Sequence, residues 1–249
     1  MKKSGTILAV ILLVLSASRT AWAVPQIDIS VGSTDSPAEL VTGLKILALL
    51  TILALAPAIL MTLTSFTRIV IILSFLRTAI GTQNAPPNQV MIGLSLFLTF
   101  FIMAPVGEKI NDTALIPYKE GQLNDEQALE AAMAPMREFM LQYTREKDLM
   151  LFYEVSELPL PKTAEEVAFR ALVPAFIISE LKTAFEMGFM LFIPFIVLDI
   201  AIASMLMSMG MIMLPPALIS LPLKLMLFVV VDGWNLIISS IVKSFSGGG

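Results

Sequence analysis

The sequence predicts an all-α integral membrane protein whose helices are kinked. Hydrophobic residues make up 57% of the chain and charged residues only 14%, whereas soluble domains carry about 25% charge. Several apolar runs approach the roughly 20 residues that a helix needs to cross a bilayer core. Prolines lie inside most of these runs, and a proline kinks or breaks a helix. A chain this apolar must give part of its surface to lipid or to partner subunits.

The first 23 residues are typical of a cleavable secretory signal. Two lysines precede an apolar stretch, residues 6–17, that is too short to span a bilayer. The small residues Ala21 and Ala23 occupy the positions that signal peptidase requires, so we expect cleavage before Val24. An uncleaved N-terminal anchor is the alternative. Residues 24–43 are polar, with proline and glycine, which predicts an exported linker.

Residues 44–106 are predicted to form an N-terminal helical hairpin region. Its first spanning helix, residues 44–63, should kink at Pro57, and its last spanning helix covers residues 89–106.

The segment between these two spans, residues 65–81, is apolar but carries Arg68 and Arg77. Nine positions apart, the two arginines lie on opposite faces of an ideal helix. Lipid would not accept an arginine on two faces. The segment therefore fits better as a helix packed in protein or at the cytoplasmic surface, and a turn over residues 81–87 follows it.

Residues 107–168 form an acidic insertion with a net charge of −7, while the rest of the chain has a net charge of +3. Helical character is expected at residues 125–140 and again at residues 140–153, before two prolines break the run. With few large apolar clusters, this segment is predicted to be a helical insertion rather than an independent domain.

Residues 169–249 are predicted to form a C-terminal helical hairpin region. The chain is apolar again, becomes more polar over residues 180–188, and is long and apolar over residues 189–209. A break at residues 211–216 separates this part from a last apolar stretch, residues 217–242.

The charge distribution suggests an orientation. Signal cleavage would place Val24 outside the cytoplasm, and one span would then bring Arg68 and Arg77 to the cytoplasmic side, where loop bases accumulate. The next span would place the acidic insertion outside. The break at residues 211–216 would lie near the cytoplasmic side and the C-terminus outside.

Ionisable side chains lie inside or beside the apolar segments. Such groups are costly in a membrane and face a partner or a water-filled path. They could form a proton relay or line a conduit, but pairing between helices or subunits is favoured, since every acid has a possible basic partner. The residues are Arg68, Arg77, Glu180, Glu186, Asp199, Lys224 and Asp232.

Methionines recur at every second position from Met205 to Met213. This spacing spreads side chains around a helix but places them on one side of an extended stretch. Because Gly210 and two following prolines predict a helix end here, Met209, Met211 and Met213 could line one face of an apolar loop. Methionine repacks around irregular shapes, so loops from several copies could form a compliant seal. Simple filling of gaps between helices is the equal alternative.

The composition excludes many kinds of chemistry. The chain has no histidine and no cysteine, which removes Ser-His-Asp and Cys-His nucleophiles, disulfides and most zinc or haem ligation. No Gly-rich phosphate loop, metal motif or basic nucleic-acid patch is present in the sequence, so no cofactor is expected and an enzyme is disfavoured. A secondary transporter using Asp199, Glu186 and Lys224 as a coupling relay is the remaining alternative, but the inverted repeats it requires are not evident.

Two blocks of the chain closely resemble the FliP family of flagellar type III secretion export-gate proteins. The first is SFTRIVIILSFLRTAIGTQNAPPNQVMIGLSLFLTFFIMAPV, residues 65–106, and the second runs from FRALVPAFIISELKTAFEMGF through MLMSMGMIMLPP to DGWNLI, residues 169–237. These blocks are specific and cover about half of the chain after the predicted signal.

The resemblance implies a ring, a pentamer of this chain, that assembles with FliQ and FliR into an export gate in the bacterial inner membrane, at the flagellar basal body. FlhA and FlhB would act with the gate, which would pass unfolded flagellar proteins. The resemblance also implies tilted hairpins that lie largely above the membrane plane, and a pore gasket at Met209, Met211 and Met213. Arg68, Arg77, Phe139, Phe152, Glu180, Asp199 and Lys224 are the residues expected at subunit contacts or in assembly.

Overall fold

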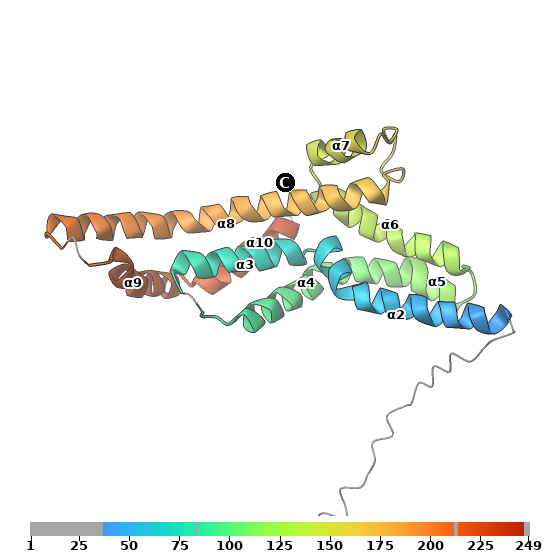
Figure 1. The fold of residues 1–249 in the computed structure, drawn as a ribbon, viewed down its shortest axis with the longest axis horizontal. Helices are drawn as coiled ribbons and strands as arrows, with labels where there is room; N and C mark the ends of the chain where they lie inside the picture. The colour runs from blue at the N-terminus through green and yellow to red at the C-terminus, as the bar shows by residue number, and fades with distance from the viewer. Residues whose placement is uncertain (1–36, 83, 212–213, 247–249) are drawn as a thin grey trace, which may run out of the picture. The chain divides into compact units, whose positions relative to one another are not determined.

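The computed structural model describes residues 37–82, 84–211 and 214–246, with side chains from residue 43 onward. Within these ranges all regular secondary structure is helical, which confirms the predicted all-α class (Figure 1). The elements are α2 (Pro37–Leu63), α3 (Phe66–Ile80), α4 (Asn88–Ile110), the π-helix η1 (Asn111–Leu115), α5 (Ile116–Lys119), α6 (Asp125–Tyr143), α7 (Glu146–Val155), α8 (Phe169–Ser208), α9 (Pro216–Val230) and α10 (Gly233–Ser246).

The chain divides into two compact units, Met1–Ile52 and Leu53–Gly249, and the division falls within α2. The predicted signal residues Ala21, Ala23 and Val24 lie outside the described residues. The helix begins earlier than the predicted start at residue 44, because Pro37 suits a first helical turn and the stretch that follows it contains no break before the apolar run.

Three described helical stretches are long and apolar enough to cross a membrane: Gly43–Leu63, Asn88–Lys119 and Phe169–Ser208. The first is apolar on all faces. The bent pair α9 and α10 adds a fourth if it is a broken span.

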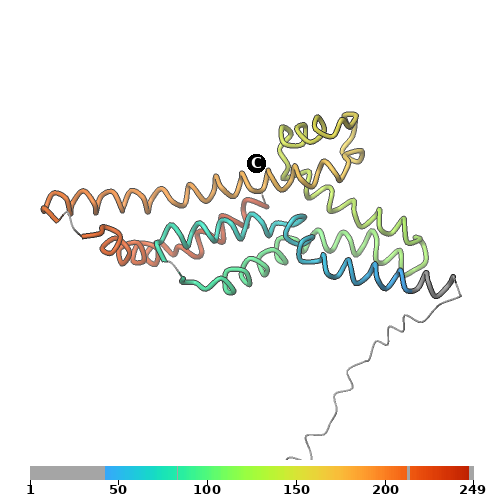
Figure 2. The backbone as a smooth tube through the Cα atoms, in the orientation of Figure 1, coloured from blue at the N-terminus to red at the C-terminus, as the bar shows by residue number. Residues whose placement is uncertain are grey.

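Helices α3 and α4 form the N-terminal hairpin of the second unit. α3 ends at Gly81, whose φ of +87° is a left-handed conformation that closes the helix and that a side chain would strain. The Gly81 N–H donates to the Thr78 carbonyl. The buried side of α3 packs along α8, and Figure 2 shows the two helices running side by side.

Helix α8 is continuous from Phe169 to Ser208, through Pro174 and Pro194. The more polar stretch at residues 180–188 does not interrupt it, because its charges are accommodated: Glu180 is buried against a partner and Lys182 forms an exposed i,i+4 pair with Glu186 at 3.4 Å.

The last apolar stretch is broken, contrary to the single stretch predicted over residues 217–242. α9 ends at Val230, and α10 begins at Gly233 with a bend of 64°. Asp232 has a φ of +50°, a left-handed conformation that aspartate tolerates better than most residues. A Cβ at Gly233 would lie 2.2 Å from the Phe228 ring, so only glycine allows this close approach.

The acidic insertion packs on both hairpins. α4 continues through η1 into α5, so the helix extends well past the predicted end at residue 106. The Asn124 side chain accepts from the Gln127 N–H, and the Gln127 side chain accepts from the Asn124 N–H, which starts α6 with a capping box. α6 contacts α4 and α8, and α7 contacts α8.

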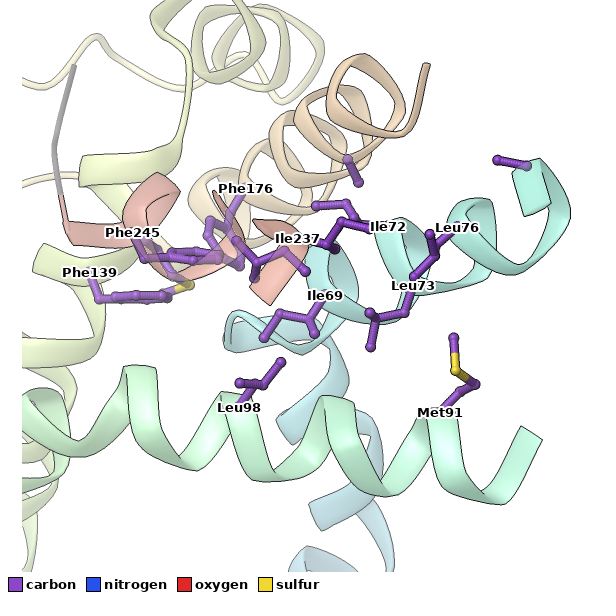
Figure 3. Close-up of a cluster of buried hydrophobic side chains, with 14 of the residues drawn as sticks. Ile69, Ile72, Leu73, Leu76, Met91, Leu98, Phe139, Phe176, Ile237 and Phe245 are labelled. Atoms are coloured by element: carbon purple, nitrogen blue, oxygen red, sulfur yellow. The ribbon is translucent and has the colours of Figure 1, made fainter. Parts of the chain in front are cut away.

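The hydrophobic core lies where α3, α4, α6, α8 and α10 meet (Figure 3). In Figure 3, Ile69 of α3 faces Leu98 of α4, and the Phe139 and Phe245 rings stack beside Phe176. Each such side chain contributes about 1.5–3 kcal/mol when it is fully buried. The core therefore fixes the acidic insertion, the first hairpin and the C-terminal helix to one another.

Candidate functional site: two ion pairs and the methionine-bearing turn

Arg68 and Glu180 form a buried ion pair at the junction of α3 and α8. The two side chains are 3% and 0% exposed. The pair is bidentate: Arg68 Nε donates to Glu180 Oε2 at 2.9 Å, and Arg68 Nη2 donates to Glu180 Oε1. This geometry is the strong form of an arginine–carboxylate contact.

The Arg68 guanidinium also holds the end of α10. Its Nη1 donates to the Ser244 carbonyl at 3.2 Å and to Ser244 Oγ at 3.0 Å. The guanidinium carbon lies 3.9 Å from the Phe245 ring centroid and 5.2 Å from that of Tyr143. Hydrogen bonds and aromatic faces thus surround the charge, and these contacts offset the cost of removing the guanidinium from water.

Tyr143 of α6 completes this junction. Its hydroxyl donates to the Phe245 carbonyl at 2.5 Å. Burial raises the pKa of Tyr143 above its usual 10.0; the charge of Arg68 acts against this rise, and that of Glu180 adds to it. Tyr143 therefore stays a neutral donor.

This junction corrects the orientation inferred from charge. Arg68 was expected on the cytoplasmic side and the acidic insertion on the other side. Because Arg68 lies against Tyr143 of the insertion, the two lie at the same end of the molecule. The arginine is there to pair with Glu180 rather than to mark a cytoplasmic loop.

The second ion pair joins α8 to α9. Lys224 Nζ lies 2.6 Å from Asp199 Oδ2, with side chains 9% and 42% exposed. Asp199 Oδ1 is buried and has no hydrogen-bond partner among the described residues. Lys224 also lines a hollow of about 490 Å³ between α9 and the turn after α3.

Arg77 is half-buried and donates from Nη1 to Asn88 Oδ1, across the turn that joins α3 to α4. All four of the predicted charges in the ion pairs, and Arg77, thus find partners within one chain. The sequence could not show this pairing, and a role at subunit contacts stays a prediction for these residues.

Phe139 is 7% exposed and packs inside the chain against Phe176 and Phe245. This position offers almost no surface to a neighbouring subunit, so the expected subunit contact is not supported for Phe139. Phe152 of α7 is half-buried against the core, which leaves part of its ring free.

A polar network that the sequence did not reveal ties α7 to α8. Ser179 Oγ donates to Asp148 Oδ2 at 2.7 Å and accepts from the Arg145 N–H at 3.0 Å. Arg145 Nη2 lies 2.6 Å from Asp148 Oδ2. Burial acts to raise the pKa of Asp148, but the hydrogen bonds from Ser179 and Arg145 and the nearby positive charges outweigh it, so this pKa is lowered. The three-residue spacing of Arg145 and Asp148 was the one available signal.

The methionine-bearing turn follows the end of α8. α8 ends at Ser208, as Gly210 and the prolines predicted, and Gly210 has a φ of +77°. The Gly210 N–H donates to the Met207 carbonyl at 3.0 Å and the Met211 N–H donates to the Leu206 carbonyl at 3.0 Å. This is the Schellman closure of a helix.

From Met209 to Met211 the backbone is not the extended one that would place the methionines on one side. Met209 is the helix cap, in the right-handed helical region, and Gly210 is left-handed, so the two-residue spacing does not place side chains on one side there. Met209 and Met211 are both exposed, and Met213 lies outside the described residues.

Among the described residues, no group of acidic side chains is placed to hold a metal ion. The candidate site consists of the two ion pairs, the aromatic junction around Arg68 and the exposed apolar turn after α8. Such an arrangement can fix helices and present an apolar tip.

A family model described as "FliP family" matches residues 49–241, from within α2 to within α10. "Flagellar biosynthetic protein FliP" of Bacillus subtilis is 52% identical over 217 residues, which cover 87% of this chain and 98% of that protein. The protein of the same name from Aquifex aeolicus is 48% identical, covering 95% of this chain and 98% of the relative.

The protein of that name from Caulobacter vibrioides is also 48% identical, over 99% of this chain and 92% of its own length. The family model covers most of the chain, and the relatives match it almost from end to end. The chain therefore belongs to the FliP family.

Proposed function

We propose that this chain is a core subunit of the flagellar type III protein export gate, through which unfolded flagellar proteins cross the bacterial inner membrane during flagellum assembly. The observation that carries this function is the near full-length match to several proteins named for flagellar biosynthesis. Three apolar helical stretches of spanning length support a membrane location.

The gate is proposed to be a ring, a pentamer of this chain with FliQ and FliR, on which FlhA and FlhB act. The fold is compatible with a ring because the Arg68–Glu180 and Asp199–Lys224 pairs form inside the chain while large apolar faces stay open. Exposed apolar side chains follow α4, α8 and α9, among them Phe97, Phe101, Phe189, Val197 and Val229. In a ring these faces would meet neighbouring subunits and lipid.

The passage is proposed to close at the turn between α8 and α9. Met209, Met211 and Met213, here called the seal, would come together from the copies of the ring. Methionine side chains are flexible and polarisable, so they can close around an irregular opening. The open apolar surface of Met209 and Met211 supports this role.

The proposed location is the inner membrane at the flagellar basal body, with the acidic insertion in the periplasm and a signal removed after Ala23. Its role is assembly and conduction rather than catalysis, so no cofactor, substrate turnover or nucleic-acid partner is proposed.

The test replaces Met209, Met211 and Met213 together with alanine in the purified, reconstituted assembly. Ion leak should rise while the mass of the native assembly stays that of a pentamer with its smaller partners, because only the seal is shortened. Met150→Ala is the matched control, since Met150 is as exposed as Met211 but lies in α7. An unchanged ion leak in a correctly assembled gate would contradict the proposed seal. A native mass of a single copy would contradict the proposed ring.

The alternative, a secondary transporter of a small solute, is not favoured by the names of the relatives. A purified chain that is a monomer and binds a small solute would favour the transporter instead.

A further inference from the structure

Four exposed methionines lie close together in sequence at the C-terminal end of α8. Met205, Met207, Met209 and Met211, here called the methionine cluster, are 42–64% exposed. By contrast, Met140 is 0% exposed and Met91 4%. The same chain therefore holds both exposed and fully buried methionines.

The local backbone explains why the cluster is uncovered. α8 ends at Ser208, and the left-handed Gly210 turns the chain away, so no further turn of helix covers the last methionines. Leu214 and Leu218, on the far side of the turn, are also exposed. The thioethers thus have little protection from within the chain.

We propose that the methionine cluster is a reversible oxidation site, at which hydrogen peroxide converts the thioethers to sulfoxides. A sulfur lone pair attacks one peroxide oxygen, an S–O bond forms and the O–O bond breaks. The proton on the transferred oxygen passes to the leaving hydroxide, so the products are a sulfoxide and water. The sulfur is oxidised by two electrons, and the peroxide is reduced by the same two. Methionine sulfoxide reductases reverse this change, with one enzyme for each sulfoxide epimer.

Oxidation changes what the turn can do. A sulfoxide is polar and accepts hydrogen bonds, whereas a thioether is apolar. An apolar tip that excludes water becomes one that binds it. That this change opens a closed passage rests on the proposed function, in which Met209 and Met211 belong to the seal.

The first measurement follows oxidation itself and does not use ion leak. The purified full-length assembly in lipid vesicles is treated with hydrogen peroxide, and peptide mass spectrometry follows the gain of one oxygen atom at each methionine. The cluster should oxidise as fast as Met150, which is exposed in α7, while Met140 stays reduced. A cluster that stays as reduced as Met140 while Met150 reacts would overturn the proposal.

The second measurement follows ion leak from the same vesicles. Peroxide should raise the leak, and methionine sulfoxide reductases should restore it. Replacing the whole cluster with leucine keeps apolar volume but removes its four thioethers. Met213 of the seal remains in this variant, so peroxide should raise its leak much less than that of the unchanged assembly. Sulfoxides in the cluster with no added leak, or the same leak in the leucine variant, would overturn the opening of the passage.

The two proposals fail in different ways. If the alanine variant of the seal does not leak while the cluster still forms sulfoxides, the seal is wrong and the oxidation site stands. If the alanine variant leaks but peroxide leaves the cluster reduced, the seal stands and the oxidation site is wrong.

Discussion

At the scale of single residues, Arg68 shows how an arginine can lie inside an apolar protein. Its guanidinium meets Glu180, the last turn of α10 and two aromatic rings. Replacing a buried pair with apolar residues is often neutral, but removing one partner leaves an uncompensated charge. The pair therefore acts mainly to fix which helices meet. Its partners are 112 positions apart, so no local pattern could have predicted the pairing.

Glu180→Gln is expected to lower the free energy of unfolding by about 3–5 kcal/mol, because Arg68 would stay charged and buried without its counter-charge. Thermal unfolding in detergent measures this loss. The double change Arg68→Met with Glu180→Leu should recover most of it. Glu138→Gln is the control, since the Lys109–Glu138 pair is solvent-exposed and such pairs contribute about 0–1 kcal/mol. Equal losses in the two single variants would contradict this account.

Asp148 gives a prediction that depends on pH. Its pKa is lowered below the usual 3.8 in the folded chain, so its stabilising effect is present above the unfolded pKa and is lost as pH falls through the folded value. Asp148→Asn should therefore loosen α7 at neutral pH. The difference from the unchanged protein should begin to shrink below about pH 4 and should close as pH falls through the lowered pKa of the folded chain. Hydrogen exchange of the α7 amides measures this, and a difference that persists in acid would argue against the ionised network.

At the scale of elements, helix ends were predictable where glycine and proline mark them. Gly210 with Pro215 and Pro216 predicted the end of α8, and Gly81 closes α3. The break between α9 and α10 was missed although the dipeptide Asp232-Gly233 is a turn signal, because the apolar run on both sides of it favours one continuous helix. The extended backbone considered for the methionines is absent from Met209 to Met211, since Gly210 turns the chain there.

The packing of α3 on α8 depends on a glycine. A Cβ at Gly188 would lie 2.6 Å from Phe75 Cδ2 and 3.1 Å from Phe75 Cβ, and Phe75 is held edge-on between Phe185 and Phe192. The ring cannot move aside, because the clash extends to the root of its side chain.

Gly188→Ala is therefore expected to destabilise the protein by about 1–3 kcal/mol, the usual cost of overpacking. Gly107→Ala is the matched control: Gly107 is also helical, but a Cβ there meets nothing within 4 Å. It should be neutral or stabilise by about 0.5–1 kcal/mol, the helix preference of alanine over glycine. Thermal unfolding of the two variants measures the difference. Equal effects would show that the Phe75 ring can move to make room for the added Cβ.

At the scale of the whole second unit, the helices place two chemically different ends apart. One end joins Arg68, the acidic insertion and the C-terminal turn of α10, since Phe245 stacks on Phe139. The other holds the turn after α3, where Gly81 and Leu221 of α9 line the same hollow. Hydropathy could predict the helices but not this grouping, because it depends on contacts between distant segments.

The separation of the two ends yields a labelling prediction. α4 joins them with 23 residues, a length of about 35 Å, which exceeds the roughly 30 Å of a bilayer core. Because the chain has no cysteine, Glu130→Cys, Ser246→Cys and Asn84→Cys each introduce a single thiol. A membrane-impermeant maleimide added to cells with a permeable outer membrane should label Glu130→Cys and Ser246→Cys. Asn84→Cys should react only after the inner membrane is broken.

If Glu130→Cys and Ser246→Cys react from opposite sides, the junction of the insertion with α10 does not exist in the membrane. If Asn84→Cys reacts from the same side as Glu130→Cys, the hairpin of α3 and α4 lies above the bilayer rather than across it.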